Sequence, residues 1–298
     1  MQLRERRCPV CGADCSENLF ADARYDAAKL NAFAYASRKT PEGMHLRLVR
    51  CDACDLIYAT PVPAMDGLAD AYEAAAFDSG EEAARAAKTY IAHIMRRVHR
   101  LPDRAGALDI GTGDGAFLER LLENGFTGVA GVEPSDAPIR AAKEHIRPLI
   151  RKGIFHESDF QPESFSLVTC FQTLEHLPDP AAVCAAAFRL LKPGGAFAVA
   201  CHNHRAFSAK LLGMNSPIFD IEHLQLFSPR GVTRLFETGG FKEIEVSSVV
   251  NTYPAHYWIK LLPLPAKDML IGLLKASGIG YIPVPLPAGN LFAVGFKK

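Results

Sequence analysis

The sequence lacks three features that would each indicate a particular class of protein. It has no excess of charge, because 33 Lys and Arg residues balance 33 Asp and Glu residues. Phosphate binding needs a local surplus of basic side chains, so nucleic acid is not expected as the main partner. It also has no apolar run of about 18 residues and no apolar leader at its start. A cytoplasmic location is therefore expected.

The sequence does have enough apolar material for one large domain and a smaller module, since 49% of its 298 residues are hydrophobic. We expect a cysteine-containing module over residues 1–62, a helical segment over 63–101 and an α/β domain over 102–298. In the α/β domain, short apolar runs alternate with helical patterns, which is typical of a doubly wound sheet.

A glycine-rich turn is the strongest local signal in this domain. The sequence Leu-Asp-Ile-Gly-Thr-Gly-Asp-Gly spans residues 108–115, between a short apolar run and a stretch with helical spacing. Glycines let a backbone pass close beneath a ligand, and the following helix offers unpaired N–H groups. The glycine spacing alone also fits a dinucleotide-binding turn.

Two carboxylates narrow the kind of ligand. Asp109 lies two residues before Gly111, where it would repel a pyrophosphate but attract an ammonium group. Glu133 ends the next expected strand, 20 residues beyond Gly113, at the spacing that lets a carboxylate bind both hydroxyls of an adenosine ribose. A ligand with a ribose at one end and a positive charge at the other is indicated.

These residues, with later motifs at 165–177, 190–195 and 237–241, resemble the class I S-adenosylmethionine-dependent methyltransferases. The resemblance implies a Rossmann-like sheet of seven strands and S-adenosylmethionine as the cofactor. The cofactor-binding residues that it implies are Tyr90, Asp109, Gly111, Thr112, Gly113, Glu133, Pro134, Phe155 and Gln172.

Two parts of this cofactor site remain open. Tyr90 is one of three candidates, with Tyr72 and Phe77, for an aromatic side chain over the methionine end of the cofactor; each can instead pack against the sheet. Relatives commonly carry an acid after the glycine of the third strand, which this sequence lacks. Adenine is therefore expected against Ile154 or Phe155, with its amine held by backbone or by Asp159.

The cysteines of the first module form two C-x-x-C pairs. Cys8 and Cys11 are separated by 39 residues from Cys51 and Cys54, and four thiolates can close a tetrahedral structural zinc site. The alternative, a disulfide or redox pair, is disfavoured in a reducing compartment. Within this module we expect a weak helix and a strand, and then a stiff linker. Their expected ranges are 22–36, 46–50 and 61–63.

The module resembles the zinc-ribbon branch of these methyltransferases, and Glu175-His176 resembles the pair found in ubiquinone-type and sugar O-methyltransferases. The resemblance implies methyl transfer, at oxygen, to a small-molecule, sugar or glycan acceptor, including a lipid-linked one. His176 and His223 are the candidate general bases, and each can instead be a structural loop histidine. A second metal site, built from residues 202–204 and 220–223, is the minor alternative.

A long insertion separates the last two expected strands, 241–250 and 290–296. Residues 251–289 are rich in proline, aromatic and apolar side chains and carry three lysines, so they suit a lid over a bulky acceptor or a peripheral membrane contact. Burial against the core or a dimer interface is the alternative, and the oligomeric state stays open.

Two rival functions also remain. An RNA base methyltransferase can combine a four-cysteine ribbon with this fold, although the zero net charge counts against it. A non-catalytic scaffold in a biosynthetic complex would use the ribbon and the insertion as docking surfaces. The intact acids and glycines of the turn argue against that second function.

Overall fold

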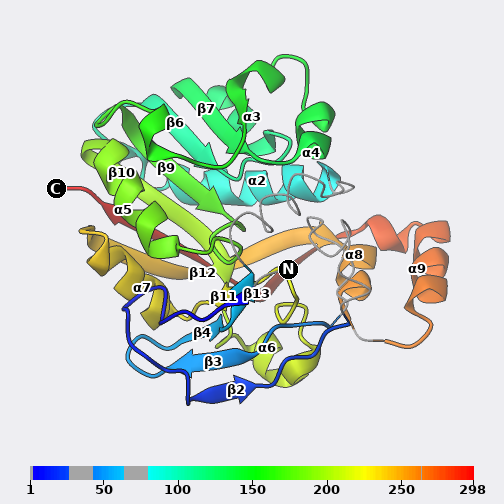
Figure 1. Ribbon diagram of the computed structural model, residues 1–298. Coiled ribbons are helices and arrows are strands. Elements are labelled where there is room, and N and C mark those ends of the chain that lie inside the picture. The colour runs from blue at the N-terminus through cyan, green and yellow to red at the C-terminus, as the bar shows by residue number, and fades with distance from the viewer. Residues whose placement is uncertain (1–2, 27–42, 64–79, 263) are drawn as a thin grey trace.

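A computed structural model describes residues 3–26, 43–63, 80–262 and 264–298 (Figure 1). Tyr72 and Phe77 lie outside the described residues, and so does most of the helix expected over 22–36. The described beginning of that stretch, 22–26, is extended and not helical, because Arg24 pairs with His45 in an isolated bridge.

The larger domain is built on a seven-stranded sheet with the order β12-β13-β10-β9-β6-β7-β8 (Figure 1). Six of these strands run in the same direction, and β13 is antiparallel to its two neighbours, β10 and β12. The central strands are long apolar runs, so both of their faces are buried, as a parallel sheet covered by helices requires. The strand bounds are β6 Ala105–Ile110, β7 Thr127–Glu133, β8 Ile150–Lys152, β9 Phe165–Phe171, β10 Leu191–His202, β12 Lys242–Pro254 and β13 Pro283–Phe296.

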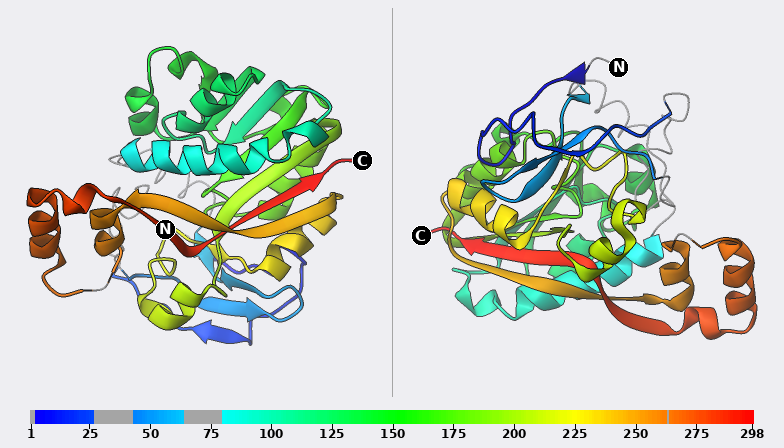
Figure 2. Two further views of the ribbon diagram at one scale, coloured as in Figure 1. Left: turned by 180° about the vertical axis from the view of Figure 1, so that it is seen from behind. Right: turned by 90° about the horizontal axis from the view of Figure 1, so that it is seen from below.

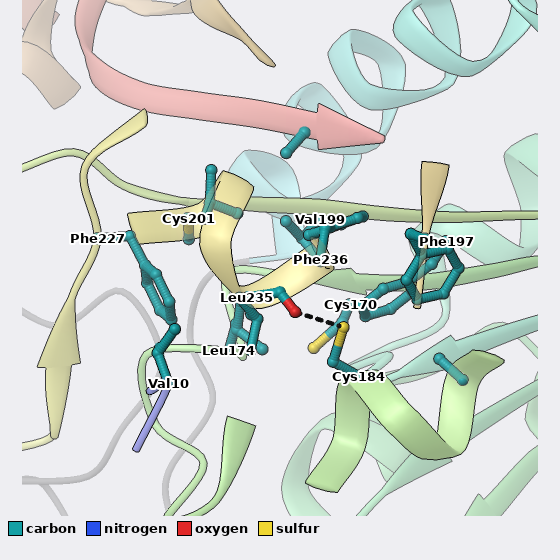
Figure 3. Close-up of a cluster of buried hydrophobic side chains, with 14 of the residues drawn as sticks. Val10, Cys170, Leu174, Cys184, Phe197, Val199, Cys201, Phe227, Leu235 and Phe236 are labelled. Atoms are coloured by element: carbon teal, nitrogen blue, oxygen red, sulfur yellow. Dashed lines mark hydrogen bonds between the residues drawn. The ribbon is translucent and has the colours of Figure 1, made fainter. Parts of the chain in front are cut away.

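Helices cover the two faces of this sheet with separate hydrophobic cores. One core packs α2 and α3 against the sheet, as the view from behind shows (Figure 2). The other packs α5 and α7, and Figure 3 shows Cys184 of α5 and Leu235 and Phe236 of α7 against the β10 side chains. The helix bounds on the two faces are α2 Gly80–Met95, α3 Ala116–Glu123, α4 Asp136–Ala141, α5 Pro180–Leu190 and α7 Pro229–Thr238.

Two of these helices begin with strong local signals. The Asp179 carboxylate accepts a hydrogen bond from Ala182 N–H at the start of α5, and the Ser228 hydroxyl accepts one from Gly231 N–H at the start of α7. In both helices, the residue after the cap is a proline, whose fixed φ suits the first helical position. The short helical segments are η3 Val98–Arg100, η4 Arg147–Leu149, η5 Glu157–Asp159, α6 Phe207–Leu212 and η6 Gly213–Asn215.

The cysteine module forms a four-stranded sheet that includes a strand from the larger domain. Its order is β11-β4-β3-β2, and β11 pairs antiparallel with β4. The linker expected at residues 61–63 is wrong, because Val62 and Pro63 form a buried strand that pairs with β1. The module is thus joined to the larger domain through a shared sheet. The strand bounds are β1 Leu3–Arg4, β2 Leu19–Ala21, β3 Leu48–Cys51, β4 Leu56–Ala59, β5 Val62–Pro63 and β11 Gln225–Leu226.

The insertion between the last two strands is a helical extension on a long β-ribbon. Both strands run further than the sequence predicts, because β12 continues pairing with β13 to Pro254 opposite Pro283. The connection holds α8 Ala255–Lys260, α9 Lys267–Ala276 and η7 Ile279–Tyr281. Figure 2 shows this extension projecting from the side of the body in both views. Within the described parts of the chain, no helix has the length and apolar character needed to cross a membrane.

Candidate active site

A cavity of about 830 Å³ opens at the carboxyl ends of the parallel strands. Asp109, Gly111 and Glu133 line one end of it, and His176, His202 and His223 line the other. Ligands of doubly wound sheets bind at this edge, where loops leave the strands and helix N-termini face outward. We describe the two ends as the cofactor half and the acceptor half.

The glycine turn gives the cofactor half its floor. Gly111 has φ of +76°, and a Cβ there would lie 2.2 Å from the Thr173 hydroxyl, so no other residue fits. The N–H groups of Gly111 and Thr112 both donate to Val132 O, which ties the turn to the neighbouring strand β7. A Cβ on Gly113 would meet no atom within 4 Å, so the backbone here is open to the cavity.

Glu133 and Asp109 are the buried acids of this half. The two carboxylate oxygens of Glu133 accept hydrogen bonds from Gly113 N–H and Ser135 N–H, both at 2.9 Å, which fixes the carboxylate beside the turn. Burial raises the pKa of Glu133 and raises that of Asp109 to about 6, despite a 2.6 Å hydrogen bond from Thr169. A cation placed beside Asp109 would offset the cost of burying its ionised carboxylate.

Three polar side-chain atoms of the residues that line the cavity are buried without a hydrogen-bond partner. They are Thr112 Oγ1, Gln172 Nε2 and Asn251 Oδ1. Gln172 also has φ of +51°, and its N–H donates to Ala200 O, so the backbone is held in an unfavoured conformation that aims the side chain at the cavity. Unsatisfied donors and acceptors beside a glycine turn fit a polar ligand such as the cofactor.

Aromatic rings enclose the rest of this half. Tyr90 of α2 lies 4.6 Å from Phe171 between ring centroids, and both line the cavity, as do Pro134 and Phe155. Asp159 does not line it, because it pairs with Arg151 at 2.8 Å. The structure therefore does not bring Asp159 to the cavity wall, whereas Ile154 and Phe155 offer an apolar surface there.

Three histidine rings meet in the acceptor half. The ring centroids of His223 and His176 are 4.9 Å apart, and those of His223 and His202 are 4.8 Å apart. His176 Nδ1 lies 3.1 Å from Glu222 O, and His223 Nδ1 lies 2.8 Å from Ile218 O. Since a carbonyl oxygen only accepts, both Nδ1 atoms must carry the hydrogen, which places the lone pair on Nε2. Both imidazoles are thus in a tautomer that suits a base.

Glu175 supports this cluster from below. It is fully buried, its Oε1 accepts from His202 N–H at 3.1 Å, and the same oxygen lies 3.7 Å from His202 Nε2. Its backbone oxygen accepts from Leu224 N–H, directly after His223. The adjacent residues Glu175 and His176 therefore differ in role. The Glu175 side chain is buried outside the cavity lining, whereas His176 lines the cavity.

The histidines of the H-x-H sequence separate in the structure. His202 lines the cavity with Nδ1 2.9 Å from Asn290 Oδ1, whereas His204 Nε2 lies 2.9 Å from Asp55 O in the cysteine module. Among the residues that the structure describes, the cysteines form the only group of three or more metal-ligating side chains close enough to share an ion. The second metal site is therefore not formed.

The insertion supplies the outer wall of the acceptor half. Tyr253, Tyr257 and Trp258 line the cavity with Leu261, and the Trp258 indole N–H donates to Val284 O at 2.9 Å across the ribbon. The sequence suggested a lid at residues 251–289 from its aromatic and apolar content, but it singled out none of these side chains. His202 was expected only as part of the alternative second metal site, on the signal of the H-x-H pattern.

The four cysteines of the module converge. Their sulfur atoms all lie within 4.8 Å of one another, with 3.5 Å between those of Cys8 and Cys54 and between those of Cys11 and Cys51. Four thiols in this compact arrangement fit a tetrahedral zinc ion with no open position. Such a site stabilises a fold and leaves no place for a substrate.

Arg6 links the module to the acceptor half. Its half-buried guanidinium donates to the backbone oxygens of Ala59, Pro178 and Leu224 and to Gln225 Oε1. Burial lowers the pKa of Arg6 to about 10, so it stays charged near neutral pH. Through these bonds, the module contacts both loops that carry the candidate bases.

Comparison with known proteins gives a family match over the core of the chain. The family described as "Methyltransferase domain" matches residues 82–246, so the module and the insertion lie outside the matched part. A ubiquinone biosynthesis O-methyltransferase of Pseudomonas fluorescens is 31% identical over 193 residues, which cover 59% of this chain and 73% of that relative. One of Methylococcus capsulatus is 33% identical over 184 residues, covering 60% and 68%.

A solved methyltransferase structure from Archaeoglobus fulgidus aligns with 71% of this chain and 94% of its own, at 16% identity and a TM-score of 0.49. The family match spans more than half of the chain and contains the glycine turn, Asp109 and Glu133, and all three histidines of the acceptor half. The chain belongs to the methyltransferase domain family and is an S-adenosylmethionine-dependent methyltransferase.

Proposed function

We propose that this protein transfers the methyl group of S-adenosylmethionine to a hydroxyl oxygen of a small-molecule, sugar or glycan acceptor. One observation carries the proposal: a single cavity joins the acid-and-glycine half to a cluster of three histidines, two of them held in the tautomer of a base. The O-methyltransferase relatives support oxygen as the methylated atom.

The cofactor half holds S-adenosylmethionine by its two ends. Glu133 accepts hydrogen bonds from the ribose hydroxyls, because each carboxylate oxygen keeps lone-pair capacity beyond its one backbone donor. Asp109 attracts the ammonium group, while Thr112 and Gln172 supply polar contacts. Tyr90 and Phe155 pack against the two ends of the bound molecule.

The acceptor half aligns the hydroxyl and removes its proton. S-adenosylmethionine supplies a methyl group that is already activated, so the protein needs to provide alignment and a base. The acceptor oxygen bonds to the methyl carbon, the carbon–sulfur bond breaks with its electron pair left on sulfur, and the hydroxyl proton passes to His223 Nε2. His223 is the first choice because it lies between the other two rings, and His176 is the alternative.

Zinc has a structural role in this proposal. Cys8, Cys11, Cys51 and Cys54 hold the ion, and the module then keeps its sheet, including β11, beside the acceptor half. Zinc would bind the four thiolates and so hold the two C-x-x-C pairs together.

The first test is calorimetric titration with S-adenosylhomocysteine, followed by an acceptor screen. We expect binding by the zinc-loaded protein and its loss in Asp109→Ala. Methyl transfer is then measured with catechols, nucleotide sugars and lipid-linked glycans. No binding by the folded protein, with or without an acceptor, contradicts the proposal and favours a scaffold. Methylation of RNA, with binding that falls steeply as salt rises, would replace the small-molecule acceptor by RNA.

A further inference from the structure

The helical extension at residues 255–287 carries a disproportionate share of the exposed apolar side chains of the described residues. Eight of the seventeen exposed large hydrophobic side chains among the described residues lie between 264 and 286. They are Leu264, Met269, Leu270, Leu273, Ile279, Tyr281, Ile282 and Leu286. Scattered single hydrophobic residues on a surface are ordinary, but such a concentration in one projecting element indicates an interaction surface.

Helix α9 is the clearest part of this surface. None of its ten residues is buried, and Met269 and Leu273 are 67% and 63% exposed. They are four residues apart, so they lie one above the other on the same side of the helix. Helix α8, in contrast, packs against the main core through Trp258 and Leu261. The extension is therefore anchored at α8 and presents α9 outward (Figure 2).

The charge of the extension differs from that of the remaining chain. It carries Lys260, Lys267 and Lys275 and a single acid, Asp268, which leaves 30 basic and 32 acidic residues elsewhere. The ion pairs found among the described residues do not involve this segment. Lys275 is exposed, whereas Lys260 and Lys267 are half-buried and Lys267 Nζ donates to Lys260 O at 3.2 Å. A segment that combines exposed apolar side chains with a surplus of lysines matches an anionic lipid surface, where the apolar groups enter the headgroup boundary and lysines meet phosphate.

A second copy of the chain fits this surface less well. A two-fold contact between two α9 helices would bring the same surface, with two lysines and one acid, against itself. We propose that the extension at 255–287 is a docking surface for an anionic lipid bilayer. Because Trp258 and Leu261 of the same extension line the cavity, docking brings the acceptor half next to the lipid surface.

The test is sedimentation of the zinc-loaded protein with vesicles. One set contains phosphatidylcholine alone and the other contains equal parts of phosphatidylcholine and phosphatidylglycerol. We expect binding to the mixed vesicles that weakens with added salt, and much less binding to the neutral ones. Leu273→Asp should lower the partition by more than about tenfold, and Lys275→Glu by about tenfold.

Matched variants distinguish docking from misfolding. Leu122→Asp changes a leucine with 38% exposure on α3, and Lys88→Glu reverses an exposed charge on α2, so both should bind vesicles like the wild type. Each variant is also titrated with S-adenosylhomocysteine, whose binding does not depend on the extension's outer surface. Vesicle binding needs no acceptor, so it can fail while the proposed methyl transfer stands, and the reverse also holds.

Three results would overturn the inference. These are absence of binding to the mixed vesicles, equal loss of binding in Leu122→Asp and Leu273→Asp, and a dimer in sedimentation velocity that Leu273→Asp dissociates. The last result would assign the surface to a second copy of the chain.

Discussion

The two halves of the cavity are built differently. The glycine turn and both acids of the cofactor half come from one continuous stretch, β6, the turn and β7, in which Glu133 bonds to Gly113 N–H only 20 residues earlier. The acceptor half is formed by the loops after β9 and β10, the 216–226 loop and the helical extension, and Arg6 connects it to the cysteine module. A half made of local contacts can keep its geometry while the other half changes its acceptor.

The largest expected effect is a loss of catalysis in the acceptor half that leaves the cofactor half unchanged. His223→Gln removes the proposed base but keeps a polar side chain, so kcat should fall about 100- to 10,000-fold while S-adenosylhomocysteine affinity stays unchanged. His204→Gln is the control, because that histidine bonds to Asp55 O outside the cavity. The measurement is methyl transfer to the acceptor found in the screen. Equal losses in the two variants would contradict a base role for His223.

The second prediction concerns the cofactor half. Glu133→Ala removes the acceptor of two backbone hydrogen bonds and of the ribose hydroxyls, so S-adenosylhomocysteine should bind about 100-fold more weakly by calorimetry. Glu144→Ala, at a largely exposed glutamate beyond α4, should bind normally. Unchanged affinity in Glu133→Ala would show that the ribose hydroxyls do not bind to Glu133.

The third prediction tests the link between the module and the acceptor half. Arg6→Met removes the guanidinium donor from four oxygen acceptors, of which Leu224 O keeps Ala59 N–H as a second donor. It should lower the free energy of unfolding by about 2 to 4 kcal/mol in urea denaturation. Hydrogen exchange should then speed up at residues 224–226 and not at 107–115. Arg7→Met, at an exposed neighbour, should change neither quantity. Uniform acceleration of exchange would argue against a local link.

The smallest expected effect is a pH dependence of cofactor binding. Burial raises the pKa of Asp109 to about 6, and an ammonium group prefers the ionised carboxylate, so affinity for S-adenosylhomocysteine should fall as pH drops below 6, by up to about tenfold per unit. Without ligand, the native carboxyl holds its proton more tightly than the unfolded one. The contribution of Asp109 to the free energy of unfolding therefore decreases as pH rises from about 4 to 6.

Calorimetry across this pH range checks the prediction, with Asp109→Asn as the control that should bind weakly at every pH. A flat profile in the wild type would show that Asp109 does not meet the ammonium group. Because Glu133 is also buried and its pKa is raised, Glu133→Gln is titrated over the same range to separate the two acids.

Local spacing was sufficient to predict the cofactor half and the cysteine cluster. Two C-x-x-C pairs place four thiols where they can meet, and an acid, two glycines and a second acid 20 residues later define a turn between adjacent parallel strands. The turn depends on contacts between neighbouring strands, and the cysteine cluster depends on four ligands of one type in two matching pairs, although 39 residues separate the pairs, so the sequence indicates both directly.

The tertiary structure alone decided the acceptor half. The sequence could not show that His202 faces the cavity while His204 faces the module, since both lie at the end of the same strand and only their distant partners, Asn290 and Asp55, separate them. It likewise predicted a linker at 61–63, where pairing with β1 makes a strand. The sequence by itself determined the cofactor turn and the thiol cluster, whereas long-range packing determined which histidines and aromatic rings surround the acceptor, because those partners lie tens to hundreds of residues apart.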